Sequence, residues 1–424
     1  MLFGRLQLSS NIIKMSLTRN EKLTLYMLAA ISFTNILDFV VLMPLGHTLQ
    51  ETFDMTPFEW SAVVSSYTLA AAVSGLLSIF IIDKFERKKM FLSIYFFFTI
   101  GTFLCGIATT YQFLLIARLF TGIFGGLINA ALFTIVGDLL PENKRGTGIG
   151  ILMTGFAVSS AVGVPIGLYL GVKIDWHAPF LIISALAAIL WVVSYKRLPV
   201  LDGHLTHKNT KTSFATPLLM VLKNKKQLTG LFALSLVFFG HFIIIPFFTP
   251  YLVSNIGFED QQLTWIYFLG GIATIYFSPK IGQWSDKFGK YKTFVIISFI
   301  TILPVLVLTN VAPMSIPFVL VLSTIMFICG SRSIPANALL INTTTAAQRG
   351  SFMSIRSSVQ NLSQGAASFA SGLIITTNPI DQTLNHYNIL GYISVTATMF
   401  GVVFFKYLKD KPVSNTQKES ISVP

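Results

Sequence analysis

Long apolar runs alternate with short polar turns over almost the whole chain. A run of about 20 apolar residues can cross the roughly 30 Å hydrocarbon core of a bilayer as an α-helix. A helix also satisfies its own backbone hydrogen bonds in lipid. The pattern therefore predicts an all-α membrane protein with twelve transmembrane helices. The runs lie near residues 24–49, 58–82, 89–108, 112–138, 146–172, 178–197, 227–254, 261–283, 292–311, 315–340, 348–376 and 386–408.

The starts of the first two runs give further detail. The first 22 residues are basic, and the apolar run behind them continues to about residue 49. This predicts an uncleaved first membrane helix rather than a signal peptide, with either Met1 or Met15 as the start of translation. At the second run, Thr56, Pro57 and Glu59 supply a cap, a first-turn proline and an acidic third position, which predicts a helix start there.

Composition agrees with a membrane protein. Of the 424 residues, 53% are hydrophobic and 11% are charged, with a mean hydropathy of +0.70. Soluble domains carry about 25% charged residues. The two cysteines, Cys105 and Cys329, lie inside apolar runs, away from other metal-ligand residues. We therefore expect both to be core residues, with neither a disulfide nor a metal site.

One polar stretch divides the apolar runs into six and six. Residues 198–226 are rich in Lys, Ser and Thr and include His204 and His207. A metal site would be the sharper interpretation of these histidines, and a solvated linker is the one we favour. The predicted organisation is a tail, a six-helix bundle, a linker, a second six-helix bundle and a tail, at residues 1–22, 23–197, 198–226, 227–408 and 409–424.

Basic residues are concentrated on one side of the predicted membrane. They lie in both tails, in the linker and in the turns after even-numbered helices, whereas the loops of the other side contain Lys173 as their one Lys or Arg. Because basic loops stay in the cytoplasm, we expect a multi-pass protein of the inner (plasma) membrane with both termini cytoplasmic. The net charge of +13 is then a matter of topology, and we expect no nucleic-acid partner.

A charged turn occurs twice in the sequence. Residues 83–91 and 286–294 both begin Asp-Lys-Phe and continue with basic residues and a Phe, at an offset of 203. Arg145-Gly146 is likewise repeated as Arg349-Gly350, at an offset of 204. Such self-similarity indicates a duplicated six-helix unit, and parallel repeats of this kind are typical of one large class of secondary transporters.

Several motifs make the resemblance specific. Asp83, Lys84, Arg87, Lys88 and Lys89, and in the second copy Gly282, Asp286, Lys287, Gly289 and Lys290, resemble the loop motif of the major facilitator superfamily. The first copy departs from it, because Ile79 and Glu86 replace its two glycines. Arg118, Gly122, Gly125 and Gly126 resemble the Arg-bearing motif of the fourth helix, with Asn129 on the same face as Arg118.

The fifth helix narrows the resemblance to one group. Gly163, Pro165 and Gly167 resemble a glycine-proline motif associated with antiporters, and Asp38 ahead of Pro44 also suits that group. The chain thus resembles the twelve-helix drug:proton antiporters. A kinked helix lined by glycines could seal one exit at the seam between the halves, although such glycines also serve ordinary close packing.

The resemblance implies a latch at the cytoplasmic side. Asp83, Arg87 and Asp138 would form a network that holds the halves together while the cavity opens outward, with Asp286 and Lys290 as the counterpart in the second half. The alternative is that these charges only set the topology.

Two charges are predicted to pair near the middle of the membrane, where a lone charge costs about 2.5–3.5 kcal/mol on insertion scales. Asp38 lies 14 residues into an outward-running helix, and Arg118 six residues into an inward-running one. At 1.5 Å per residue these positions are roughly 21 Å from the inner face and roughly 9 Å from the outer face, so the depths coincide. We expect an Asp38–Arg118 pair, with Asn35 one turn away.

The repeat places His241 at the depth of Asp38, because the two are 203 residues apart. We therefore expect a carboxylate and an imidazole that face each other across a central cavity, where both can exchange protons near neutral pH. A packing role for a lone histidine in an apolar helix is the alternative.

The second half adds Arg332 and a polar stripe of Arg356, Gln360 and Gln364. If the arginines face the cavity, they favour an anionic substrate; otherwise they extend to the inner surface. Aromatic residues that could line the rest of the cavity are Phe39, Tyr67, Phe239, Phe242 and Tyr267.

The leading functional hypothesis is a secondary active transporter that exports a small molecule, anionic or drug-like, in exchange for protons by alternating access. An uptake symporter or uniporter of the same fold is the alternative. The sequence contains no nucleophile elbow, paired-histidine metal motif or phosphate-binding loop, so neither an enzyme nor an ATP-driven pump is expected. We expect no cofactor beyond the proton gradient, and a monomer whose partners are substrate and lipid.

Overall fold

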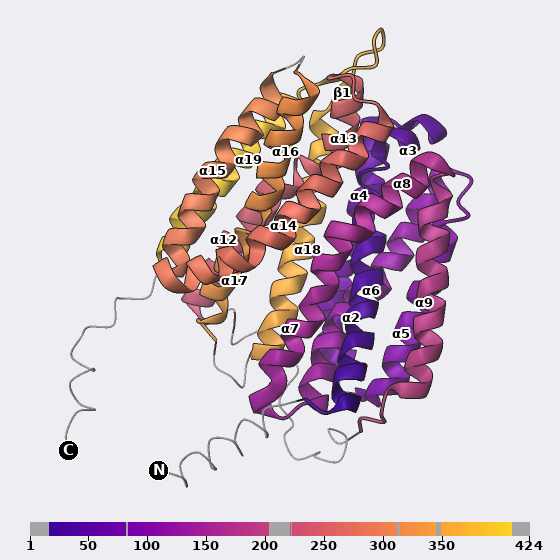
Figure 1. Cartoon of the computed structure of the whole chain (residues 1–424), viewed down its shortest axis with the longest axis vertical. Helices are drawn as coiled ribbons and strands as arrows, with labels where there is room; N and C mark the ends of the chain where they lie inside the picture. The colour runs from indigo at the N-terminus through magenta and orange to yellow at the C-terminus, as the bar shows by residue number, and fades with distance from the viewer. Residues whose placement is uncertain are drawn as a thin grey trace, which may run out of the picture.

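The computed structural model describes residues 17–81, 84–202, 221, 223–311, 314–344 and 349–408. In this part of the chain the long elements are all helices, arranged as two bundles that lie side by side (Figure 1). The expectations for His204 and His207, for Asp83, for residues 1–16 of the first tail and for the second tail fall outside the described residues.

The first bundle holds the helices up to residue 197. They are α2 (Arg19–Val40), α3 (Gly46–Phe53), α4 (Pro57–Ile81), α5 (Arg87–Cys105), α6 (Tyr111–Leu139), α7 (Glu142–Val158), the π-helix η2 (Ser159–Gly163), α8 (Val164–Lys173) and α9 (His177–Arg197).

The second bundle begins at residue 225. It contains α12 (Lys225–Phe242), α13 (Ile245–Ser254), α14 (Asp260–Phe288), α15 (Lys290–Asn310), α16 (Ile316–Gly330), α17 (Ser333–Ile341), α18 (Arg349–Ile374) and α19 (Tyr387–Lys406).

These helices confirm the all-α membrane fold, since every predicted run is helical. Ten helical stretches of the described chain are long and apolar enough to cross a membrane. The two remaining runs form α14 and α18, helices of 29 and 26 residues that are more polar along their length. The predicted helix start at Pro57 is also present, because Thr56 and Glu59 hydrogen-bond each other's backbone N–H at 3.3 and 2.9 Å.

Three of the predicted helices are each broken in two, which the apolar pattern did not reveal. The first run breaks after Val40 and resumes at Gly46, the seventh breaks between α12 and α13, and the tenth between α16 and α17. Pro44, Pro246 and Pro335 lie in or just after these breaks. A proline lacks the N–H that continues a helix, which accounts for breaks at these places.

A short β-pair is the other element that the pattern missed. β1 (Thr376–Thr377) pairs antiparallel with β2 (Leu384–Asn385) between α18 and α19. The side-chain amide of Asn255 donates to the backbone oxygen of Leu384 at 3.0 Å and accepts from its N–H at 2.9 Å. The β-pair is therefore attached to the end of α13.

The two ends of the molecule differ in how the bundles share their apolar cores. We call the end where the described chain starts at Leu17 and stops at Leu408 the basic face, because the basic turns lie there. At the opposite face one continuous core contains residues of both bundles, including Val41, Trp60 and Phe247. At the basic face each bundle has a core of its own. In Figure 1 the bundles lie together at the top; toward the lower end α15 and α17 of the second bundle lie away from the first bundle, while α18 stays beside it.

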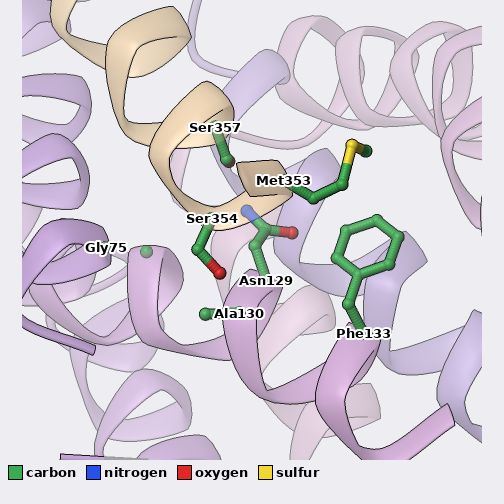
Figure 2. Close-up of a pocket in the computed structure, with 8 residues that line it drawn as sticks. Gly75, Asn129, Ala130, Phe133, Met353, Ser354 and Ser357 are labelled. Carbon is green, nitrogen blue, oxygen red and sulfur yellow. The ribbon is translucent and has the colours of Figure 1, made fainter. Parts of the chain in front are cut away.

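Helices α4 and α18 remain in contact along the seam through small residues. A Cβ on Gly365 would meet Leu69 at 2.7 Å, and one on Gly75 would meet the Ser358 hydroxyl at 2.7 Å. Toward the basic face a cavity of about 10 Å³ lies between the helices. Figure 2 shows Asn129 of α6 beside it, with Ser354 and Ser357 of α18. That volume is about the space one water molecule needs.

Glycines also bring α4 and α6 together inside the first bundle. A Cβ on Gly122 would collide with the backbone of Tyr67, and one on Gly126 with the backbone of Ala71. Close approach of helix backbones is a common means of packing in lipid, where no hydrophobic drive holds helices together.

Replacing Gly122 with alanine therefore tests the packing of α6. Overpacking against a backbone costs about 1–3 kcal/mol, so Gly122→Ala should lower the melting temperature of the purified protein in detergent. Gly137→Ala on the same helix is the matched control, because no atom lies within 4 Å of its added Cβ. Equal melting temperatures for the two variants would contradict the packing account.

Candidate functional site

A buried ion pair lies inside the first bundle. The Nη1 atom of Arg118 on α6 is 2.9 Å from Oδ2 of Asp38 on α2. Both side chains are 0% exposed. The expected Asp38–Arg118 pair is therefore present, and it brings together helices that are 80 residues apart in the chain.

The break in the first membrane helix creates a second contact for Arg118. Because α2 ends at Val40, the carbonyl of Asp38 lies in the last turn, where carbonyls lack a partner within the helix. Arg118 Nη1 donates to this carbonyl at 3.1 Å. The guanidinium thus contacts both the carboxylate and the backbone of residue 38.

An aromatic ring and an amide complete the surroundings. The guanidinium carbon of Arg118 lies 4.6 Å from the centroid of the Tyr67 ring, a cation–π geometry. The Tyr67 hydroxyl donates to Asn35 Oδ1 at 3.0 Å. A Cβ on Gly125 would collide with that hydroxyl, so the glycine makes room for the tyrosine.

Several polar atoms at the pair lack a hydrogen-bond partner among the described residues. They are Oδ1 of Asp38, Nε and Nη2 of Arg118, and the hydroxyl of Thr102 on α5. Buried polar groups are normally satisfied, and unsatisfied ones often mark functional positions. Asp38 retains an oxygen free to take a proton, and Arg118 retains donors free to take another acceptor.

The equivalent helix of the second bundle is related to α2 by the repeat offset. Phe39 and Phe242, which are 203 residues apart, stack with their ring centroids 6.1 Å apart. Phe39 also stacks on Tyr67 at 5.1 Å. A row of three aromatic rings therefore crosses the seam between the bundles.

The expectation that Asp38 and His241 face each other is wrong for this structure. Asp38 points into its own bundle toward Arg118. The ring of His241 lies against α16, since a Cβ on Gly330 would be 3.9 Å from its Cε1 atom. Instead, the rings of Phe39 and Phe242, the residues that follow Asp38 and His241, meet at the seam.

Two further arginines are placed inside the second bundle. Arg332 is 2% exposed and lies at the break between α16 and α17. Arg356 on α18 donates from Nε to Asn337 Oδ1 at 2.7 Å and from Nη2 to Gln360 Oε1 at 2.8 Å. Arg332 is therefore buried inside the bundle, whereas Arg356 is partly exposed and hydrogen-bonded to two side-chain amides, so the alternative that it extends to the inner surface stays open.

The sequence profile of the Major Facilitator Superfamily matches residues 28–248 and 230–423. The chain belongs to this superfamily. It is a multi-pass membrane protein, and the two helical bundles described above have the fold of this superfamily.

Two curated relatives indicate what similar transporters do. One is a probable sugar efflux transporter of Helicobacter pylori (strain P12), 24% identical over 228 residues, or 54% of this chain and 56% of the relative. Another is multidrug resistance protein 3 of Bacillus subtilis (strain 168), 30% identical over 254 residues, or 53% of this chain and 47% of the relative. The chain thus spans about half the length of the curated relatives it matches.

Two solved structures share the fold of the transporter. A bacterial homologue of the human lysosomal transporter Spinster, in an inward-facing and occupied conformation, has a TM-score of 0.70 at 14% identity, covering 94% of this chain and 100% of that chain. The nucleoside transporter NupG has a TM-score of 0.72 at 17% identity, covering 92% and 99%. These likenesses concern the fold alone.

The charged turn of the first bundle forms an ion pair within that bundle. Arg87 Nε lies 2.9 Å from Asp138 Oδ2, which joins the start of α5 to the end of α6. Asp286 and Lys290 make no ion pair with another described residue. The described ion pair of this motif thus lies within the first bundle, and a latch between the halves stays a prediction.

Glu86, which replaces a glycine of the motif, caps α5. Its carboxylate accepts the backbone N–H groups of Lys88 and Lys89 at 2.8 and 2.9 Å, and that of Leu201 at 3.2 Å. Burial raises the pKa of Glu86, but these N–H donors outweigh burial and hold the pKa below its usual value. The start of the linker is thereby fixed to this turn.

The glycine-proline motif lies in a distorted helix at the seam. The π-helix η2 ends at Gly163, and α8 follows with Pro165 in its first turn. Gly163 and Gly167 face α2, where an added Cβ would meet Leu37 and Val41 respectively, while Ala161 of η2 packs against Gly271 of α14 in the second bundle. The motif therefore combines close packing with a position between the halves.

Sequence patterns did not predict several other contacts. Asn337 and Thr102 are single polar residues in apolar runs, and nothing in their spacing marks a partner. Trp60 is fully buried and donates from its indole N–H to the carbonyl of Pro246 in the second bundle at 2.8 Å. This contact spans 186 residues, so only the folded chain reveals it.

Removing the carboxylate of residue 38 tests the energetics of the pair. Asp38→Ala leaves Arg118 buried without an anion, which costs about 3–5 kcal/mol, and should lower the melting temperature in detergent strongly. Asp38→Asn removes the same charge but keeps a neutral oxygen that can accept from Arg118, so it should also lower the melting temperature, by less than Asp38→Ala. If neither variant lowered the melting temperature, the pair would not carry this energy.

Proposed function

We propose that the transporter exports a small molecule from the cytoplasm in exchange for protons. In this proposal the basic face and both termini are cytoplasmic, the membrane is the inner (plasma) membrane, and the monomer is the working unit. The observation that carries the proposal is the fully buried Asp38–Arg118 pair, whose second carboxylate oxygen makes no ion pair with a described residue and no hydrogen bond of good geometry.

Protonation of Asp38 would change the energy of the site. The neutral acid no longer compensates Arg118, and an uncompensated charge in a low-dielectric interior is costly. The strain is relieved if Arg118 reaches water or an anionic group, which favours a different arrangement of the helices around it. Since both side chains are 0% exposed here, the proton enters only after such a rearrangement.

The break after Val40 provides a place for that movement. The segment from Val41 to Leu45 connects α2 to α3, and α3 belongs to the closed opposite face. There Gly46 fits under Trp60, whose indole N–H is bonded to Pro246. Asp38 therefore lies two residues before the end of α2, and the chain that continues from α2 into α3 helps to close the opposite face.

The asymmetry of the cores supports alternating access. The opposite face is closed by a core shared between bundles, and the basic face has two cores that can separate. In this proposal, separation of the two cores at the basic face would admit cargo from the cytoplasm. The names of the relatives, sugar efflux and multidrug resistance, support export as the direction.

Asp38→Asn tests the coupling. In proteoliposomes with a pH-sensitive dye inside, wild-type transporter should move protons when lactose, ethidium or 2-naphthoate is added and one of them is transported. Asparagine mimics the protonated acid permanently, so Asp38→Asn should abolish the proton movement while the protein still elutes as a folded monomer.

The matched control is Asp381→Asn, which makes the same change in the exposed turn between β1 and β2 and should couple normally. Reversing the proton gradient separates export from uptake, because an antiporter accumulates substrate against the gradient and a symporter along it. Proton-coupled transport by Asp38→Asn would refute the assignment.

A further inference from the structure

The second bundle contains a buried guanidinium with no counter-charge. Arg332 is 2% exposed, and its Nη1 atom has no hydrogen-bond partner among the described residues. By contrast, Arg118 has Asp38, and Arg356 has the amide oxygens of Asn337 and Gln360. Arg332 thus has an unsatisfied donor and no ion pair with a described residue, which distinguishes it from both Arg118 and Arg356.

The sequence shows that no acid of this bundle is placed to neutralise it. Between residues 225 and 408 the acidic residues are Glu259, Asp260, Asp286 and Asp381. The first two cap and begin α14, the third lies in its last turn, and the fourth lies between the β-strands. All four therefore lie at helix ends or in turns, whereas Arg332 lies at a break in the middle of the tenth membrane segment.

The break orients Arg332 beside groups at the seam. The turn between α16 and α17 follows Gly330, whose hydrogen faces the His241 ring. Arg332 follows Gly330 by two residues, so it belongs to the same turn that faces His241. His241 is in edge contact with Phe242 at 5.7 Å, and Phe242 stacks on Phe39 of the other bundle.

Exposure differs along this path. Arg332 is buried, whereas His241, Phe242 and Phe39 are only half-buried. The half-buried rings leave aromatic surface for a ligand at the seam. An aromatic surface binds an apolar body, and a guanidinium binds a carboxylate through paired hydrogen bonds.

We propose that Arg332 is the anion-binding residue of the substrate site, and that the substrate is an organic monocarboxylate with an aromatic or apolar body. The carboxylate would take the free donors of Arg332, and the body would lie on Phe242 and Phe39. One negative charge fits, because the Asp38–Arg118 pair is already neutral. The proposal rests on the transport function above and specifies its substrate class.

The uncompensated charge has a consequence for the empty protein. An isolated cation inside a membrane protein destabilises it, so a residue kept there for folding alone would be expected to have a partner. Arg332→Gln should therefore raise the melting temperature of the substrate-free transporter. A purely structural arginine would give the opposite result.

The binding experiment uses purified transporter in detergent and two probes of the same shape, 2-naphthoate and its neutral amide, 2-naphthamide. Ligand that binds the folded state raises the melting temperature. Wild type should be stabilised by naphthoate by about 2 °C or more at saturation, and clearly less by naphthamide. Arg332→Gln should lose the difference between the probes, and Arg332→Lys, which keeps the charge, should retain part of it.

Arg197→Gln is the matched control, because it removes an exposed arginine at the end of α9 and should leave the difference between the probes intact. Equal shifts with both probes, no shift with either, or an undiminished preference for naphthoate in Arg332→Gln would each overturn the proposal. No proton gradient exists in detergent, so the binding result does not depend on coupling. Proton-coupled transport can fail while the preference for naphthoate holds, and the preference can fail while proton-coupled transport holds.

Discussion

The structure depends on an ion pair that is removed from water. Asp38 and Arg118 join two helices of the first bundle at a place where neither charge would be tolerated alone. Their contact uses both the carboxylate and the carbonyl of residue 38, and that carbonyl is available because the helix ends two residues later. The ring of Tyr67 covers the guanidinium. Protonation of Asp38 therefore leaves Arg118 without a counter-charge and destabilises this arrangement of the bundle.

The contacts between the two bundles differ at the two faces, so a change at the ion pair can affect one face more than the other. At the opposite face they share one apolar core, which includes the buried Trp60 and its bond to Pro246. At the basic face they meet through glycine and serine residues of α4 and α18, with room for about one water molecule between them. Small and polar contacts separate at lower cost than a shared apolar core. The same fold can thus be closed on one side while it is ready to part on the other.

The sequence predicted the twelve helices and the Asp38–Arg118 pair because both follow from one-dimensional rules. Apolar length fixes the membrane helices, and counting residues fixes the depth of a charge. The repeat offset was also informative, since Phe39 and Phe242 do meet at the seam. It failed for their neighbours, because equal depth does not decide which way a side chain points, and His241 faces α16. The helix breaks had a signal in Pro44, Pro246 and Pro335 that apolar length does not show, whereas single polar partners such as Asn337 depend on the packed neighbours, which no spacing records.

The central claim is that protonation of Asp38 shifts the balance between the two bundles, and a distance measurement tests it most directly. Spin labels at Lys196 and Lys287, exposed positions near the basic-face ends of α9 and α14, would report the separation of the bundles by pulsed electron resonance, with the buried Cys105 and Cys329 left in place. We predict that the distance distribution of wild type changes between about pH 8 and about pH 5, and that Asp38→Asn shows the low-pH distribution at both values. A pH-dependent change that persists in Asp38→Asn, or a wild type whose distances do not respond to pH, would contradict the account.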